Sequence, residues 1–195
     1  MGHALAGAPR DCPRIVSNLE RLACFDEAAG TPARVTTQPW SAPEHDAPSV
    51  LRVMASEAQR TGDDLTFRLS GQHPESLLIA APAIVAVEPR PYLAISCVQN
   101  ISRLQLISGQ PIEAKWVNVQ LRTERETTEA SAWQVMENGQ VLDAGRGLPA
   151  IEQIRRLFGA HRIHVVSDHP RFDGLTFDAQ GLDPLIDQAR KACRW

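Results

Sequence analysis

The sequence predicts an α+β fold: a disulfide-stapled N-terminal helical hairpin, then an antiparallel β sandwich or strongly curved sheet, then a C-terminal helix–strand–strand–helix tail. Three observations predict it. Short apolar segments with a period of two, separated by turn residues, fill the middle of the chain. Helix start and stop signals occur at both ends. Four cysteines lie at the ends of predicted elements, as is typical of disulfides that join elements.

Composition narrows the class of protein. A chain of 195 residues can form one domain with a small appendage and bury a real core. A net charge of -3 and an aromatic content of 5% argue against nucleic-acid binding, which needs a basic face and stacking side chains. The longest apolar stretch, Leu77 to Val87, contains Pro82 and is far too short to span a membrane.

The first predicted unit, residues 1–30, is a helical hairpin. One straight helix would hold Cys12 and Cys24 about 18 Å apart, whereas a disulfide tolerates at most about 7 Å between Cα atoms. Ser17 and Glu20 form a capping-box pattern, which starts a new helix near Asn18 that ends before Gly30. The segment before Ser17 can then fold back, so that a bridge can staple the hairpin.

A linker and a larger domain follow. Residues 31–49 are rich in proline and are predicted to be a linker or surface loop. Residues 50–195 are predicted to form an α+β domain. Its expected strands are Val50–Ala55, Leu65–Leu69, Leu77–Val87, Tyr92–Val98, Arg103–Ile107, Ile112–Arg122 and Ser131–Met136.

The tail is predicted to be a helix from Pro149 to Gly159, strands at Arg162–Val166 and near Leu175–Phe177, and a last helix capped by Asp183. Cys193 falls on the apolar stripe of that last helix and therefore faces inward. A bridge from Cys193 to Cys97 would tie the helix to the sheet. Four cysteines allow three pairings, so the connectivity stays open.

The cysteines also indicate a compartment. Disulfides persist where conditions are oxidising, so we expect an exported protein. Met1 to Leu5 has neither the basic nor the apolar region of a signal peptide, and we therefore expect that the native leader has been removed from this sequence. The competing interpretation is a cytoplasmic protein with four free thiols.

Candidate catalytic groups have simpler explanations. Ser167-Asp168-His169 contains the residue types of a catalytic triad, but adjacent side chains cannot form the relay, and a polar turn is favoured. His161 and His164 lie three apart in a strand and would point to opposite faces, so we expect no metal site. Glu124, Glu126 and Glu129 are expected to be a solvated hairpin tip. We expect neither a cofactor nor a catalytic residue.

Two features suggest a binding surface. Trp116 lies on the polar face of its strand, where it marks either a contact surface or a site covered by the proline-rich loop. The tail is locally basic, and this is either the solvated face of a helix or a patch for an acidic partner. The candidate partner-binding residues are Trp116, Arg155, Arg156 and Arg162.

The order of motifs resembles a known family. Cys12-x-x-Ile15 precedes Arg21-Leu22-Ala23-Cys24-Phe25-Asp26, Ile95-Ser96-Cys97-Val98-Gln99-Asn100 lies in the β region, and Ala192-Cys193-Arg194-Trp195 comes last. This order resembles the type VI secretion system-associated VasI/TagO family over residues 12–195. The resemblance implies that the four cysteines are structural bridges and that Arg21, Asp26, Asn100 and Gly181 are framework positions.

The resemblance also implies a function: a periplasmic, non-enzymatic accessory protein that binds a component or effector of the secretion apparatus. Two alternatives remain open. One is a periplasmic hydrolase directed at the cell wall that uses residues 161–173. The other is a carrier of a small ligand or lipid with its pocket between the sheet and the tail helices. The oligomeric state is not predicted.

Overall fold

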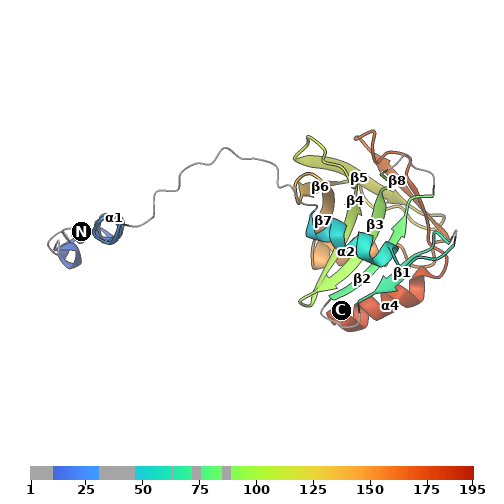
Figure 1. The fold of residues 1–195 in the computed structure, drawn as a ribbon, viewed down its shortest axis with the longest axis horizontal. Coiled ribbons are helices and arrows are strands. Elements are labelled where there is room, and N and C mark those ends of the chain that lie inside the picture. Colours follow the sequence, from blue (N-terminus) through green and yellow to red (C-terminus); the bar gives the residue numbers. More distant parts are fainter. Residues whose placement is uncertain (1–10, 31–46, 63, 72–75, 85–88) are drawn as a thin grey trace, which may run out of the picture. The chain divides into compact units, whose positions relative to one another are not determined.

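The computed structural model describes residues 11–30, 47–62, 64–71, 76–84 and 89–195 (Figure 1). The chain divides into two compact units, Met1–Ala42 and Pro43–Trp195. Each unit is described by itself. The predicted helical hairpin lies in the first unit and the predicted α+β domain in the second.

The first unit is a stapled hairpin, as predicted. A short 3-10 helix, η1 (Cys12–Arg14), precedes helix α1 (Asn18–Ala29). The Ser17 side chain accepts a hydrogen bond from the Glu20 amide, and Gly30 ends the helix in the left-handed region with φ of 67°. Cys12 and Cys24 are bridged with their Cα atoms 5.6 Å apart.

Within its described residues, the second unit is built on one nine-stranded antiparallel sheet with the order β1-β2-β3-β4-β7-β6-β5-β8-β9. Its strands are β1 Arg68–Ser70, β2 Ser76–Pro82, β3 Tyr92–Val98, β4 Ile101–Ile107, β5 Trp116–Arg122, β6 Ser131–Met136, β7 Val141–Arg146, β8 Arg162–Ser167 and β9 Thr176–Asp178. The Ile84 amide donates to the Thr176 carbonyl at 2.8 Å, and Thr66 forms a bridge with Asp178. The two ends of the sheet therefore meet, which makes it a strongly curved sheet.

The concave face of this sheet holds the main hydrophobic core. Alternate strand residues, including Ile95, Leu106 and Trp133, are fully buried there. Helices α3 (Leu148–Arg155) and α4 (Leu182–Cys193) add Ile154 and Ile186 to the same cluster. The Cys97–Cys193 disulfide fixes the end of α4 to β3, with 5.8 Å between the Cα atoms.

Helix α2 (Pro48–Glu57) packs on the convex side of the sheet, against β2, β3, β4 and β7 (Figure 1). Val50 and Val53 pack there against a second cluster formed by Leu78, Ala80, Ala94, Ile107 and Val141. The Glu137 carboxylate accepts hydrogen bonds from the Ser49 amide at 2.9 Å and the Ser49 hydroxyl at 2.7 Å. A carboxylate at this position stabilises the start of a helix.

The expected strand Val50–Ala55 is therefore wrong. Val50 and Val53 are three residues apart, the spacing of one helical face, and Pro48 occupies the first turn, where it needs no amide partner. Ala47, placed in the predicted linker, is fully buried in the second cluster. Pro48 and Ser49, also placed in that linker, begin α2, and residues 31–46 lie outside the described residues.

Other boundaries differ by a few residues. The last helix begins at Leu182 with Gly181 as its N-cap, because Asp183 accepts a hydrogen bond from the Gly159 amide at 2.8 Å instead of capping its own helix. Strand β7 was not predicted, since Asp143 and Gly145 interrupt its apolar pattern. The predicted end of Leu77–Val87 lies partly outside the described residues. No helix in the described part of the chain has the length and apolarity to cross a membrane.

Candidate functional site

The outer face of β5, β6 and β8 lies beyond the strands that α2 covers. Its residues alternate with buried ones along each strand and are exposed or half-buried. We call this surface the outer face, and it consists of Trp116, Asn118, Gln120, Arg122, Ala132, Gln134, Arg162 and His164.

Hydrogen bonds hold the polar side chains of the outer face in place. The Asn118 amide side chain donates to the Asp168 carboxylate at 2.6 Å, and Gln120 donates to the Thr128 carbonyl at 3.1 Å. Beside them, Trp116 at the start of β5 is 58% exposed. An exposed tryptophan beside pre-organised polar side chains is typical of a residue that contributes strongly to protein binding.

The structure divides the four predicted partner-binding residues. Trp116 and Arg162 both lie on the outer face. Trp116 begins β5, whereas Arg122 at the other end of β5 pairs with His164, which is two residues from Arg162 on β8. Six residues along a strand correspond to about 20 Å, so Trp116 and Arg162 mark opposite ends of the surface. Arg155 and Arg156 lie at the end of α3, apart from it.

Arg155 and Arg156 make intramolecular contacts. The Arg155 guanidinium lies 5.4 Å from the centre of the Trp195 ring, and the Arg190 guanidinium lies 5.7 Å from it. The Trp195 indole donates to the Ser102 hydroxyl at 2.8 Å. This cluster was missed from the sequence, because its members are separated by up to 93 residues. Arg156 forms an exposed ion pair with Glu126 at 3.4 Å.

The hairpin tip around residues 124–126 contacts the segment after α3. The Glu124 carboxylate accepts a hydrogen bond from the His161 amide at 3.1 Å. Hydrogen bonding to its own amide, and then to the His161 amide, lowers the pKa of Glu124, while desolvation opposes this. The Arg125 guanidinium lies against Gly159, whose φ of 71° is in the left-handed region that favours glycine.

The Ser167-Asp168-His169 segment forms a turn. The Ser167 hydroxyl accepts from the His169 amide at 3.2 Å, and His169 Nδ1 accepts from the Arg171 amide at 3.2 Å. Asp173 accepts from the Ser167 amide at 3.0 Å. These polar groups therefore stabilise the connection between β8 and β9. Within the described ranges, no three His, Cys, Asp or Glu side chains come close enough to hold a metal ion.

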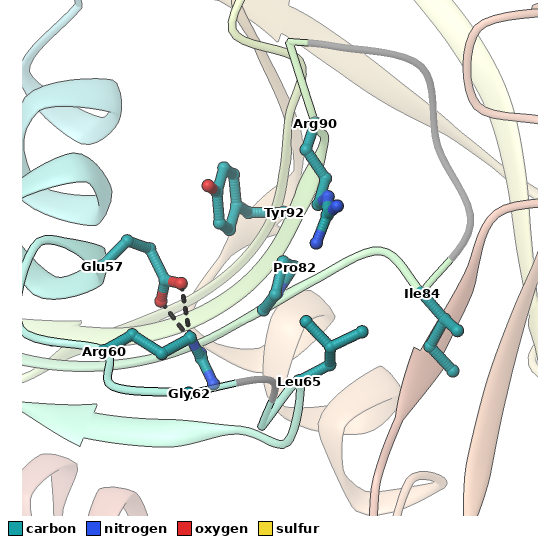
Figure 2. A pocket seen from close by; sticks show the side chains of 8 residues that line it. All are labelled: Glu57, Arg60, Gly62, Leu65, Pro82, Ile84, Arg90 and Tyr92. Carbon is teal, nitrogen blue, oxygen red and sulfur yellow. Dashed lines mark hydrogen bonds and ion pairs between the residues drawn. The ribbon is translucent and has the colours of Figure 1, made fainter.

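Two pockets lie outside the outer face. The first, of about 430 Å³, opens where α2 ends beside the meeting edges of the sheet (Figure 2). Arg60 forms paired hydrogen bonds with Glu57 at 2.6 and 2.9 Å and donates to the Asp64 and Thr66 carbonyls. Figure 2 shows Arg90 on another wall of the pocket, with its side chain extending toward Pro82. The Glu57–Arg60 pair fixes the loop after α2.

The second pocket, of about 540 Å³, lies between α3 and the sheet. The predicted carrier function places its ligand between the sheet and the tail helices, and this pocket occupies that region. Glu129, Ser131, Glu152, Gln153 and Arg156 line it. Ala144 and Pro149 are the apolar residues of the lining, and the three charged side chains beside them do not suit a lipid tail.

The chain was compared with protein families, curated proteins and solved structures. The model of a family described as type VI secretion system VasI, EvfG matches residues 11–195. No curated protein and no solved structure matches the chain.

Proposed function

Because the chain belongs to the VasI family of type VI secretion system proteins, we propose that it is a periplasmic, non-enzymatic accessory protein that binds another protein through the outer face. Association with the secretion system follows from the family. The compartment, the lack of catalysis and the binding surface are the proposed parts.

The exposure of Trp116 carries the proposal. Binding energy at protein interfaces is concentrated in a few residues, among which tryptophan is strongly represented. Trp116 is 58% exposed and shares its strand face with Asn118 and Gln120, whose own hydrogen bonds already orient them. Such a surface loses little conformational entropy on binding, which favours affinity.

Two further observations support the other parts. Both disulfides require an oxidising compartment in which to form and persist, which favours the periplasm. The groups that a hydrolase at residues 161–173 would use are engaged in the turn between β8 and β9. This arrangement favours binding over catalysis.

The test is affinity purification of tagged variants from cells that carry the secretion system. Trp116→Ala is expected to lower recovery of a secretion-apparatus component by about tenfold or more. Leu148→Ala is the matched control, because Leu148 is 73% exposed but lies on α3. It is expected to retain the component, as is His169→Ala.

Undiminished recovery by Trp116→Ala would contradict the proposed surface. Loss of secretion with His169→Ala, while the partner is still recovered, would instead favour the hydrolase.

A further inference from the structure

Helix α1 has an apolar surface that the described residues of the first unit leave exposed. None of its residues is buried. Leu19 is 81% exposed, Leu22 58% and Phe25 46%, and Val16, just before the helix, is 93% exposed. Apolar side chains gathered on one exposed surface are typical of a binding site.

The three helical side chains lie on the side away from the staple. At about 100° per residue, Leu19, Leu22 and Phe25 fall within an arc of about 120°. Cys24 is about 160° away from Leu22 around the helix. The bridge to Cys12 therefore holds η1 against the opposite side and leaves this arc, which we call the α1 arc, facing outward.

The unit is also pre-organised for binding. A helix of 12 residues is marginal by itself in water. Here the Ser17 cap, the left-handed Gly30 and the Cys12–Cys24 bridge stabilise it without any contribution from the α1 arc. The ordering entropy is thus lost before any partner arrives, which favours affinity.

We propose that α1 is a docking helix, whose arc inserts into an apolar groove with a basic rim on a partner protein. Residues 11–30 carry four acidic and two basic side chains, a net charge of -2. Asp26 lies within the arc, between Leu19 and Leu22 around the helix axis. A basic rim complements this charge, and helix-in-groove binding uses apolar anchors spaced as these are.

Two other occupants fit less well. Three partly exposed side chains supply on the order of 300–400 Å² of apolar surface, whereas a stable dimer buries about 800 Å² per partner. A groove in a partner would also cover the sides of the helix and so bury more of its surface. A second copy of the helix would contact the arc alone. The net negative charge disfavours an anionic lipid surface. This inference concerns the first unit and stands apart from the outer face.

The experiment is photo-crosslinking of the full chain in cells that carry the secretion system. Benzoylphenylalanine replaces Leu22 in one variant and Glu20, about 160° around the helix, in a control. We expect one discrete adduct with a different protein from position 22 and little from position 20. Adding Leu19→Ser to the position-22 variant is expected to reduce the yield of this adduct by about tenfold, and adding Asp26→Asn is expected to reduce it by a smaller factor.

Two more variants separate this inference from other causes. Cys12→Ala/Cys24→Ala is expected to reduce the adduct, because the helix loses its staple. Trp116→Ala is expected to leave it unchanged, which distinguishes failure here from failure of the outer face. Peptide mapping checks that Leu19→Ser retains the Cys12–Cys24 bridge.

Three results would overturn the inference: an adduct between two copies of the chain, an adduct within one chain or with lipid alone, or equal yields from positions 20 and 22. The inference would also be overturned if Leu19→Ser and Asp26→Asn each gave the same adduct yield as the chain without that substitution. The arc and its charge would then contribute nothing to binding.

Discussion

The Asp143 carboxylate is only 3% exposed and accepts three hydrogen bonds. Arg103 donates to it at 2.9 Å, Gln105 at 2.8 Å and the Gly145 amide at 2.8 Å. The bonds from Arg103 and Gln105 join β4 to β7, where the register shifts between Arg103 and Gln105. A buried carboxylate is tolerated when its partners satisfy it in this way.

Asp143→Ala is therefore expected to lower the free energy of unfolding by about 3 kcal/mol, because it leaves Arg103 and Gln105 without their acceptor. Urea denaturation measures the change. Glu126→Ala is the control: it removes an ion pair whose Glu126 and Arg156 side chains are 54% and 48% exposed. Its effect is expected to stay within about 0.5 kcal/mol, and equal losses from the two variants would contradict this account.

Asp64 gives a prediction about pH. Hydrogen bonds from the Thr66 amide, at 2.9 Å, and then from the Thr66 hydroxyl lower the pKa of Asp64 from its usual 3.8. A carboxyl with a lowered pKa stabilises the folded loop above the unfolded pKa and loses this contribution as the pH falls through the folded value.

In an NMR acid titration, the Thr66 amide shift should therefore have its midpoint below pH 3.8. Asp64→Asn should abolish the titration. A midpoint at or above pH 3.8 would mean that this turn does not hold the carboxylate.

Single residues were predictable where a local pattern determines their role. Ser17 and Glu20 lie three apart and cap α1, and Trp116 is exposed as its place on a polar strand face indicated. Arg155 and Trp195 are 40 positions apart, and no sequence pattern indicates that they meet. The sequence predicts Arg155 as a partner-binding residue, which stays a prediction, and the structure adds its contact with Trp195.

Among the elements, the two disulfides act on very different loops. Cys97–Cys193 closes a separation of 96 residues and joins α4 to the sheet, whereas Cys12–Cys24 closes one of 12. Closing the longer loop restricts the unfolded chain more, which predicts greater stabilisation. Both cysteines of the shorter bridge lie in the first unit, so we expect it to stabilise that unit.

Cys97→Ala/Cys193→Ala is expected to lower the free energy of unfolding of the second unit by about 3–5 kcal/mol. Cys12→Ala/Cys24→Ala is expected to leave that transition within about 0.5 kcal/mol of the wild type. Thermal and urea unfolding of both double variants measure the difference. A comparable loss from the Cys12/Cys24 pair would show that the first unit stabilises the second.

Element prediction succeeded where periodicity was clear and failed at α2. The strand Tyr92–Val98 was predicted with its observed bounds. In α2, the β-branched Val50 and Val53 favoured a strand. The Glu137 side chain that stabilises the start of α2 is 88 residues away, so this tertiary contact overrides the local preference.

For the whole molecule, the sequence predicted antiparallel strands and a curved sheet but not the strand order. Strand β4 lies between β3 and β7, and β6 and then β5 follow on the far side of β7. Curvature brings Thr66 to Asp178 across more than 100 residues, and only the folded chain shows that these edges meet. The outer face could not be delimited in advance, because its extent depends on which strands α2 covers.

The central claim is that both bridges form in a protein that works in the periplasm. Non-reducing peptide mapping of the chain, recovered from its own cells by osmotic shock, tests this most directly. We predict that the shock fluid contains the chain, with Cys12 linked to Cys24 and Cys97 linked to Cys193. Recovery from the cytosol with alkylatable thiols at all four positions would contradict it.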